Sequence, residues 1–402
     1  MKVETVIIGA GLSGLSCAIQ LEKERRDYLL IEKANRIGGR LGSIYDKGNI
    51  YDVGFQVFNT AYKNTMQLLD RDEVELKMFK PGSVIHDGKS FNLISDPLRD
   101  PKQLFTSLFS SISTFKDKIK ILSLIVELIN YDIQNDNSTD MQTIDYLKKK
   151  EFSDEFIELF FTPFFAGIFL EKDLLTSSKF FKYVFSNFSN GLACLPSEGM
   201  QKIPDLIFKN ISSDRLLLNQ SLERIEDNGL LIFNNGQTIK GNNIVLTGGS
   251  HKKIGLNKVS YNSVRNIYFE SDIKIENGKY IHLFPKDSTI NNVAVLNQVS
   301  HNYSKSNSLL SISVIGHELK DKLDIKQFKR RLANYFGGND SNYEWVKSFD
   351  IKNATIKQNT NFFESNTYSL SKGFIIAGDH SVYGSIEGAV LSGINASKKI
   401  LN

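Results

Sequence analysis

Three glycines and one carboxylate near the N-terminus have the types and spacing to bind a diphosphate and a ribose. Gly9, Gly11 and Gly14 form a G-x-G-x-x-G turn after the apolar run 5–8, and a helical run follows. Gly9 permits a tight turn, Gly11 lets the backbone approach a pyrophosphate, and Gly14 lets helix and strand pack closely. The phosphates would then lie on the unpaired amides at the N-terminus of the helix.

Glu32 adds a group that recognises ribose. It ends a second apolar run, 28–31, and lies 18 residues after Gly14. An acid at this position can bind ribose hydroxyls and would repel a 2′-phosphate. The spacing therefore predicts a dinucleotide cofactor, with the first helical residues Leu12 and Ser13 at its phosphates.

The residues after Glu32 indicate which dinucleotide binds. Lys33 is followed by the run Gly38-Gly39-Arg40, in which two glycines suit a backbone wrapped against a charged ligand and Arg40 suits a phosphate. Dehydrogenases that use NAD do not need this element. The combination resembles the FAD-dependent amine oxidase and phytoene (carotenoid) desaturase superfamily, and the chain is closest to the desaturase-like branch. The resemblance implies FAD as the cofactor, with Lys33, Gly39 and Arg40 in contact with it.

The C-terminal residues carry the same resemblance. The run 373–379 reads as a buried strand ending in Gly378-Asp379, and the run 384–393 opens a final helix. In the family, the Gly-Asp acid binds the ribitol or pyrophosphate region, and the helix directs its N-terminus at the flavin pyrimidine. Free amides and a helix dipole there stabilise the negative charge of a reduced flavin. The resemblance therefore implies contacts from Glu387, Gly388 and Ala389.

Further site residues are implied by position. A D-x-G-x-Q segment, which contains Gly54, Phe55 and Gln56, passes close to the flavin ring in the superfamily, and the backbone at Leu222 touches the adenine. Candidate substrate-pocket groups, for each of which a purely structural role is the alternative, are Phe165, His282, Phe284, Tyr383 and Ser385. We expect no cysteine–flavin bond, because residues 370–390 contain no cysteine, so FAD would be held noncovalently.

Composition narrows the class of protein. The chain has 402 residues and a net charge of only +4, which does not favour nucleic-acid binding. Its two cysteines indicate a reducing compartment, and its six histidines lack metal-ligand spacing, so we expect no metal site. Because the first strand begins at residue 3 and no apolar run approaches about 18 residues, we expect neither a signal peptide nor a spanning helix. The sequence predicts a cytoplasmic protein that is either soluble or peripheral to a membrane.

The motifs divide the chain into alternating segments. We expect an α/β fold in which a Rossmann-like, glutathione-reductase-type FAD domain contains an inserted mixed α+β substrate domain. Residues 1–75, 197–250 and 365–402 form the FAD domain. Residues 76–196, mostly helical, and 251–364, rich in strands, form the substrate domain.

A long apolar stripe leaves two interpretations open. Apolar residues recur at helical spacing from Leu104 to Ile129. Such a stripe is usually an ordinary core face. The alternative is a channel for a lipophilic substrate or a face that contacts a membrane.

The predicted reaction is hydride transfer from a C–H or C–N bond to flavin N5. It needs orientation, a dry cavity and charge compensation rather than a catalytic side chain, so we name no catalytic residue. A desaturase-like dehydrogenase of a small or lipophilic substrate is preferred over an amine oxidase, because Ser385 stands where many amine oxidases have an aromatic residue. A flavin-dependent isomerase and a non-catalytic flavin protein are further alternatives. The sequence indicates neither the oligomeric state nor the electron acceptor.

Overall fold

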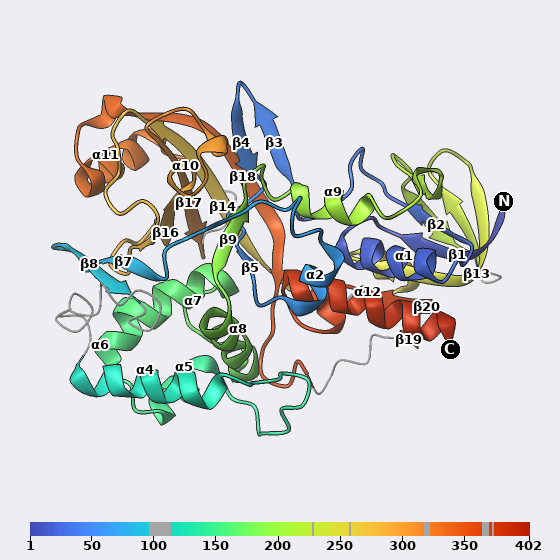
Figure 1. Ribbon diagram of the computed structural model, residues 1–402, viewed down its shortest axis with the longest axis horizontal. Helices are drawn as coiled ribbons and strands as arrows, with labels where there is room; N and C mark the ends of the chain where they lie inside the picture. The colour runs from blue at the N-terminus through green and yellow to red at the C-terminus, as the bar shows by residue number, and fades with distance from the viewer. Residues whose placement is uncertain (96–113, 227–228, 257–258, 317–321, 364–369, 372–373) are drawn as a thin grey trace.

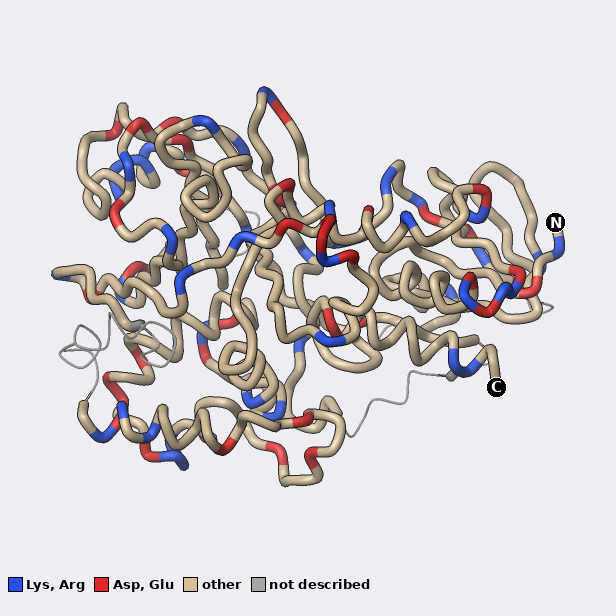
Figure 2. Tube along the Cα trace, viewed as in Figure 1, with Lys and Arg blue, Asp and Glu red and all other residues tan. Residues whose placement is uncertain are grey.

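The computed structural model describes residues 1–95, 114–226, 229–256, 259–316, 322–363, 370–371 and 374–402. Two lobes, each built around one sheet, lie side by side (Figure 1). The first lobe holds both chain termini, and the second holds a seven-stranded sheet above a group of helices. Acidic and basic residues are interspersed over both lobes (Figure 2).

The sheet of the first lobe is parallel at its centre. Strand β1 pairs in parallel with β2 and β13, β2 with β10, and β13 with β20, while β11, β12 and β19 pair antiparallel. The strands are β1 (Lys2–Ile8), β2 (Tyr28–Ile31), β10 (Leu216–Leu217), β11 (Leu222–Ile225), β12 (Leu230–Phe233), β13 (Thr238–Thr247), β19 (Leu370–Ser371) and β20 (Phe374–Ala377).

Both faces of this sheet are covered, which explains why its central strands are apolar throughout. Side chains alternate between faces along a strand. Ile7, Leu30 and Val245 therefore pack on one side, with helices α1 (Leu12–Lys23) and α12 (Ile386–Leu401), and their neighbours pack on the other. Helices α1 and α12 cross closely (Figure 1) because Gly393 presents no side chain: a Cβ there would lie 2.0 Å from the carbonyl oxygen of Ser13.

The second sheet combines strands from two distant segments. Its order is β18-β14-β17-β16-β15-β7-β8, antiparallel except for β15 with β7. Helix α11 (Ile325–Phe336) packs on one face through Phe328 and Leu332. The remaining bounds are β7 (Gly82–His86), β8 (Phe91–Ser95), β14 (Tyr261–Ser271), β15 (Ile281–Leu283), β16 (Asn292–Val295), α10 (Leu296–Val299), β17 (Ser308–Ile315) and β18 (Tyr343–Ile356).

Below this sheet lies a group of helices with an aromatic core (Figure 1). Phe161, Phe165 and Phe181 are almost completely buried there and contact one another. The helices are α4 (Phe115–Leu128), α5 (Thr143–Lys149), α6 (Asp154–Phe156), the π-helical turn η2 (Ile157–Phe161), α7 (Thr162–Phe169) and α8 (Ser178–Asn190). The phenylalanine-rich run seen in the sequence is thus largely a packing element.

The predicted apolar stripe falls into two parts. Its first residues, 104–112, lie outside the described residues. The rest belongs to α4, where Leu124 and Leu128 face the core while the stripe from Phe115 to Ile129 faces solvent. The interpretation of the stripe as an ordinary core face is therefore wrong for these exposed residues, which we call the outer stripe, because the core face of α4 is the side that carries Leu124 and Leu128.

Short elements carry the chain between the lobes. The hairpin β3 (Ser43–Asp46)–β4 (Asn49–Asp52) and a small sheet of β5 (Phe58–Asn59), β9 (Ala193–Pro196) and β6 (Leu76–Met78) lie between them, with α2 (Lys63–Leu68) and α9 (Lys202–Phe208). Short 3-10 turns, η3 (Ser213–Arg215), η4 (Ser250–Ile254), η5 (His301–Tyr303), η6 (Asp340–Asn342) and η7 (Asp379–Ser381), complete the described elements. None of the helices in the described ranges is long and apolar enough to cross a membrane.

Candidate functional site

The turn between β1 and α1 has a backbone that glycine alone fits comfortably. Gly9 has a φ of +104°, and a Cβ there would lie 2.3 Å from Thr247 Oγ1. A Cβ on Gly14 would lie 1.9 Å from the carbonyl oxygen of Gly9, so α1 packs directly on the turn. Gly11 is the N-cap residue of α1 and bridges to Gly38. The first amides of α1, which have no partners within the helix, thus lie at the carboxyl edge of the sheet.

Glu32 follows β2 at the same edge and is held in place by backbone amides. The amide of Ala10 donates to its Oε2 at 2.8 Å, and the amide of Ala34 donates to its Oε1 at 2.9 Å. The residue is 7% exposed. A carboxylate has about four acceptor sites, so both oxygens keep capacity for a further donor such as a ribose hydroxyl.

The Gly38-Gly39 loop is shaped by Arg36, a residue that the sequence motifs did not indicate. The guanidinium of Arg36 donates to the carbonyls of Ile37 and Leu41 at 3.0 and 2.8 Å, and to that of Gly39 at 3.0 Å. These bonds fold the loop back on itself and press Gly39 against Gly11, whose Cα would lie 3.2 Å from a Cβ on Gly39. Arg36 therefore orders the loop that presents Arg40.

Arg40 and Asp379, from opposite ends of the chain, form an ion pair. Arg40 Nη2 lies 2.6 Å from Asp379 Oδ1, and the two side chains are 38% and 5% exposed. Arg40 also donates from Nη1 to the carbonyl of Ala354 at 3.2 Å. The pair joins the loop after β2 to the loop after β20, and an anionic ligand would compete with Asp379 for the guanidinium.

These elements surround a cavity of about 740 Å³, which we call the cofactor cavity. Its lining includes five cationic side chains and only two acidic ones, an excess of positive charge that suits a diphosphate. The predicted cofactor residues that line it are Gly9, Gly11, Leu12, Ser13, Glu32, Lys33, Gly39, Arg40, Gln56, Leu222, Gly378, Asp379 and Ala389. A helix N-terminus, a carboxylate at a strand end and surplus cations in one cavity fit a dinucleotide.

At the start of α12, two residues that were predicted to contact the cofactor contact other parts of the protein. The carboxylate of Glu387 faces away from the cofactor cavity, because it accepts hydrogen bonds from the amides and side chains of Asn64 and Thr65 at 2.7–2.9 Å. Gly388 permits close approach to protein rather than to a ligand: a Cβ there would lie 2.0 Å from the carbonyl oxygen of Tyr383. Both residues therefore fix α12 against its neighbours, Glu387 through the first turn of α2.

Ser385 lies where the helix meets the cavities. Its Oγ caps α12 by accepting from the amide of Gly388 at 2.8 Å. Ser385 and Ile386 line the cofactor cavity and also a second cavity of about 240 Å³, which we call the substrate cavity. The N-terminus of a 16-residue helix thus lies at the boundary between the two.

The substrate cavity is mainly apolar. Its lining includes Phe55, Val57, Phe164, Ile168 and Val184, and also the predicted residues Gly54 and Gln56. Arg40, which it shares with the cofactor cavity, is the only charged side chain among its described lining residues. Two of the polar residues that line it, Asn59 and Asn292, come from strands far apart in the sequence, and no local spacing indicated them.

Four predicted pocket residues lie elsewhere. Along β15, Ile281 and Leu283 line the substrate cavity, so His282 points to the opposite face, against the rings of Phe91 and Phe336. Burial there lowers the pKa of His282 to about 4. Phe284 packs on Tyr335, Tyr383 packs on Tyr183, and Phe165 lines a third cavity of about 180 Å³. Of the five predicted pocket residues, the substrate cavity is lined by Ser385 alone.

Comparison with known proteins identifies the family. The sequence model of the flavin containing amine oxidoreductases matches residues 12–401. The chain belongs to this family. The 15-cis-phytoene desaturase of an Oncidium hybrid cultivar is 24% identical over 457 residues, which cover 97% of this chain and 76% of that protein. The family confirms the predicted superfamily and a flavin as the cofactor.

Two further matches differ in kind. The zeta-carotene desaturase of Capsicum annuum is 38% identical over 71 residues, which are 17% of this chain and only 12% of that protein. The structure of an engineered putrescine oxidase superposes with a TM-score of 0.73 at 14% identity, covering 100% of this chain and 99% of that one. At 14% identity the match to the putrescine oxidase structure shows similarity of fold alone. It confirms the predicted fold class.

Proposed function

We propose that the protein holds FAD noncovalently in the cofactor cavity and dehydrogenates a neutral, lipophilic substrate in the substrate cavity, in the manner of a desaturase. Bound FAD would supply a hydride acceptor. The amides at the start of α1 would bind its diphosphate, Glu32 a ribose, and the amides at the start of α12 would face the ring. Both cysteines, Cys17 and Cys194, are buried away from the two cavities, which supports a noncovalent complex.

The observation that carries the preference for a neutral substrate is the charge of the substrate cavity. An amine enters as a cation, and burying a cation without a counter-charge is costly. Among the described residues that line this cavity no side chain is acidic, and the nearby charge of Arg40 is positive. Ser385, which stands where many amine oxidases have an aromatic residue, lines this cavity, whereas the predicted pocket residue Tyr383 is 5% exposed and packs against Tyr183. Both features favour desaturase-like chemistry over amine oxidation.

An anaerobic flavin-bleaching screen tests this proposal. Purified protein should be yellow and release intact FAD on denaturation. Neutral polyenes and other lipophiles should bleach the flavin faster than amines of similar size. Faster bleaching by amines would make the protein an amine oxidase, and product without net electron transfer would make it an isomerase. A flavin that responds to none of these compounds would contradict an enzymatic function.

The outer stripe of α4 supports one further part of the proposal, peripheral contact with a membrane. Its five apolar side chains recur every three or four residues and are 43–74% exposed: Phe115, Ile119, Leu122, Val126 and Ile129. Lys116, which is exposed, lies beside this stripe and suits an anionic headgroup. On the inner side of α4, Ile121 and Ile125 line the third cavity, which shares Phe164 with the substrate cavity. A lipophilic substrate could thus pass from a membrane to the flavin through apolar surroundings.

Vesicle flotation tests this contact. The protein should float with vesicles that contain phosphatidylglycerol, and L122S/V126S should reduce flotation at unchanged flavin content. The matched control is S123A, which changes an exposed residue beside the stripe. A wild-type protein that does not float would contradict membrane contact. If the wild type forms a concentration-dependent dimer and L122S/V126S is monomeric, the stripe is an interface with a second copy of the chain instead.

A further inference from the structure

Three amide side chains that line the substrate cavity each have a buried polar atom without a hydrogen-bond partner. They are Gln56 Oε1, Asn59 Nδ2 and Asn292 Nδ2. Asn59 is 3% exposed and Asn292 is 2% exposed. A buried polar group without a partner costs free energy, and protein structures rarely leave one without a reason. Because all three residues line one cavity, a ligand there would complete the bonding of these atoms after a small turn of the side chain.

Each side-chain amide already makes a hydrogen bond through one of its two polar atoms. That bond shows which atom, the oxygen or the NH₂ nitrogen, is left without a partner. Asn59 Oδ1 accepts from the amide of Ala61 at 2.8 Å, and Asn292 Oδ1 accepts from Asn291 Nδ2 at 3.0 Å. The NH₂ groups of Asn59 and Asn292 are therefore left as donors. Gln56 Nε2 donates to the carbonyl of Arg40 at 3.2 Å, which leaves its Oε1 as an acceptor.

The three groups occupy different parts of the wall. Gln56 lines both cavities and therefore lies toward the cofactor. Asn292 pairs in the sheet with Leu283 and Ser313, which also line the substrate cavity. Asn59 comes from β5, in the small sheet between the lobes. Hydrogen bonding is thus available at separate points of a surface that is otherwise mainly apolar.

We propose that the substrate is a mainly hydrocarbon molecule with a neutral oxygen function, a carbonyl or a hydroxyl, that accepts a hydrogen bond from Asn59 or Asn292. This inference rests on the proposed function and narrows its substrate class. A pure hydrocarbon leaves both donors unpaired, and a carboxylate would bring a charge that only Arg40 could balance. A neutral oxygen on an apolar body satisfies a donor and keeps the apolar contacts.

Binding of a matched pair of probes to the holoenzyme tests the inference. The pair is 2-undecanone and undecane, and the measurement is the change in the visible spectrum of the bound flavin. A donor that pairs with the ketone and not with the alkane should raise the ketone-to-alkane affinity ratio about tenfold to a hundredfold above the ratio of their water-to-hexadecane partition coefficients, which accounts for desolvation of the carbonyl; this excess is the ketone preference. An affinity ratio of the wild-type protein that equals the ratio of the partition coefficients would overturn the inference.

Isosteric variants show which group binds the oxygen. N59L and N292L remove the NH₂ donor and put no other donor in its place, whereas a buried Asp would be protonated and would still donate. At least one of them should remove most of the ketone preference at unchanged flavin content. The matched control is N235L on an exposed turn, where Oδ1 likewise accepts a backbone amide at 3.0 Å. A ketone preference that survives both changes would overturn the assignment to Asn59 and Asn292 and would leave Tyr183 Oη, which also lines the cavity without a partner, as the donor.

The two proposals fail in different ways. If hydrocarbon polyenes bleach the flavin and the ketone has no advantage, the protein is a desaturase-like enzyme and the oxygen function is disproved. If only amines bleach it, the proposed function itself is wrong. A wild-type preference for the ketone supports the inference even where a variant fails to fold, because that comparison needs no substitution.

Discussion

Glu32 is oriented by the backbone before any ligand reaches it. Two amides hold its carboxylate at the edge of the cofactor cavity, so binding a ribose requires no rearrangement of the side chain. We expect E32A to weaken FAD binding by about 1.5–3 kcal/mol, the scale of a hydrogen bond to a charged group. Titration of the flavin-free protein with FAD, followed by flavin fluorescence, measures this.

E24A is the matched control, because Glu24 is an exposed acid just after α1. Its FAD affinity should equal that of the wild type. An E32A protein that binds FAD as tightly as the control would show that Glu32 only supports the turn through Ala10 and Ala34.

Residues are predictable from sequence where their contacts are local. Gly9, Gly14 and Glu32 act within one strand–turn–helix unit, so their spacing carries the information. Glu387 contacts Asn64, more than 300 positions away, and His282 faces one side of β15 rather than the other. No spacing in the chain specifies either fact, because each depends on how distant elements pack.

At the scale of elements, Gly388 lets the first turn of α12 pack on the chain before it. A Cβ at this position would lie 2.0 Å from the carbonyl oxygen of Tyr383, and backbone atoms cannot move aside cheaply. We expect G388A to destabilise the protein by about 1–3 kcal/mol, the usual cost of overpacking, and G388V by more. Thermal unfolding of the flavin-loaded protein measures this loss of stability.

G249A is the control for this prediction, since Gly249 has a φ of −86° and open space where its Cβ would lie, and both variants are also compared without flavin because Gly249 lines the cofactor cavity. Its unfolding temperature should stay close to that of the wild type. If G388A loses flavin while keeping wild-type stability, Gly388 contacts the cofactor, as the sequence alone suggested.

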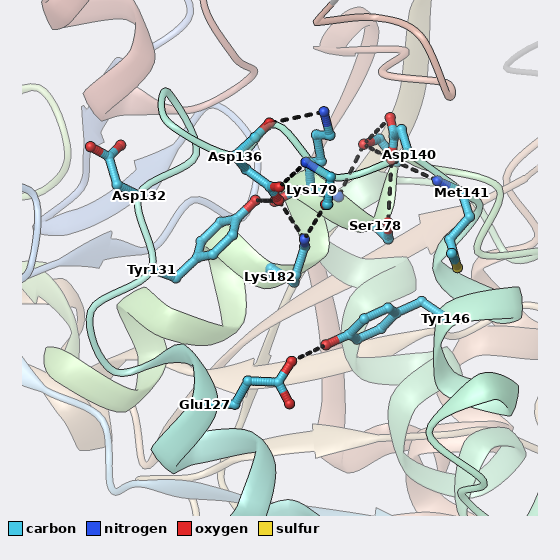
Figure 3. A network of polar contacts seen from close by, with 12 residues as sticks. Glu127, Tyr131, Asp132, Asp136, Asp140, Met141, Tyr146, Ser178, Lys179 and Lys182 are labelled. Carbon is cyan, nitrogen blue, oxygen red and sulfur yellow. Dashed lines mark hydrogen bonds and ion pairs between the residues drawn. The ribbon is translucent and has the colours of Figure 1, made fainter.

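A buried ion pair fixes the loop after α4 onto α8 (Figure 3). Asp136 and Lys182 are 8% and 11% exposed, and Tyr131 Oη also donates to Asp136 at 2.7 Å. Burial opposes the charged form, but hydrogen bonds from Lys182, Ser138 and Tyr131 outweigh it and hold the pKa of Asp136 well below its usual range. The structure thus favours the ionised carboxylate.

This pair predicts a pH dependence. A lowered pKa in the folded state stabilises the protein at pH values above the unfolded pKa of about 3.9, and the contribution is lost as the pH falls below it. D136N should lose about 3–5 kcal/mol at pH 7, because Lys182 stays buried without its counter-charge, and should show a weaker loss on acidification. D132N, at an exposed position in the same loop, is the control for unfolding curves between pH 3 and pH 7.

At the scale of the whole molecule, the fold class followed from the motifs, but the way the lobes join did not. The parallel sheet follows from apolar runs that are buried on both faces. The junction depends on Asp52, a residue of the D-x-G-x-Q segment that is 2% exposed. Its carboxylate accepts from the amide of Met200 at 2.9 Å and from Tyr303 Oη at 2.7 Å, and its carbonyl accepts from Tyr268 Oη at 2.9 Å.

These bonds bring together four segments of the chain, so the stability of the junction should depend on each of them. Y303F removes one donor and leaves Asp52 Oδ2 buried without that partner, which should cost about 1–3 kcal/mol of unfolding free energy. Y45F is the matched control, because Tyr45 Oη donates to the carbonyl of Glu198 at an exposed position; it should change stability by less than about 0.5 kcal/mol. Denaturant unfolding followed by flavin release and by the fluorescence of Trp345, the chain's single tryptophan and a residue of β18 in the second lobe, separates the two lobes. If Y303F unfolds at the wild-type midpoint by both signals, the bond to Asp52 does not hold the lobes together.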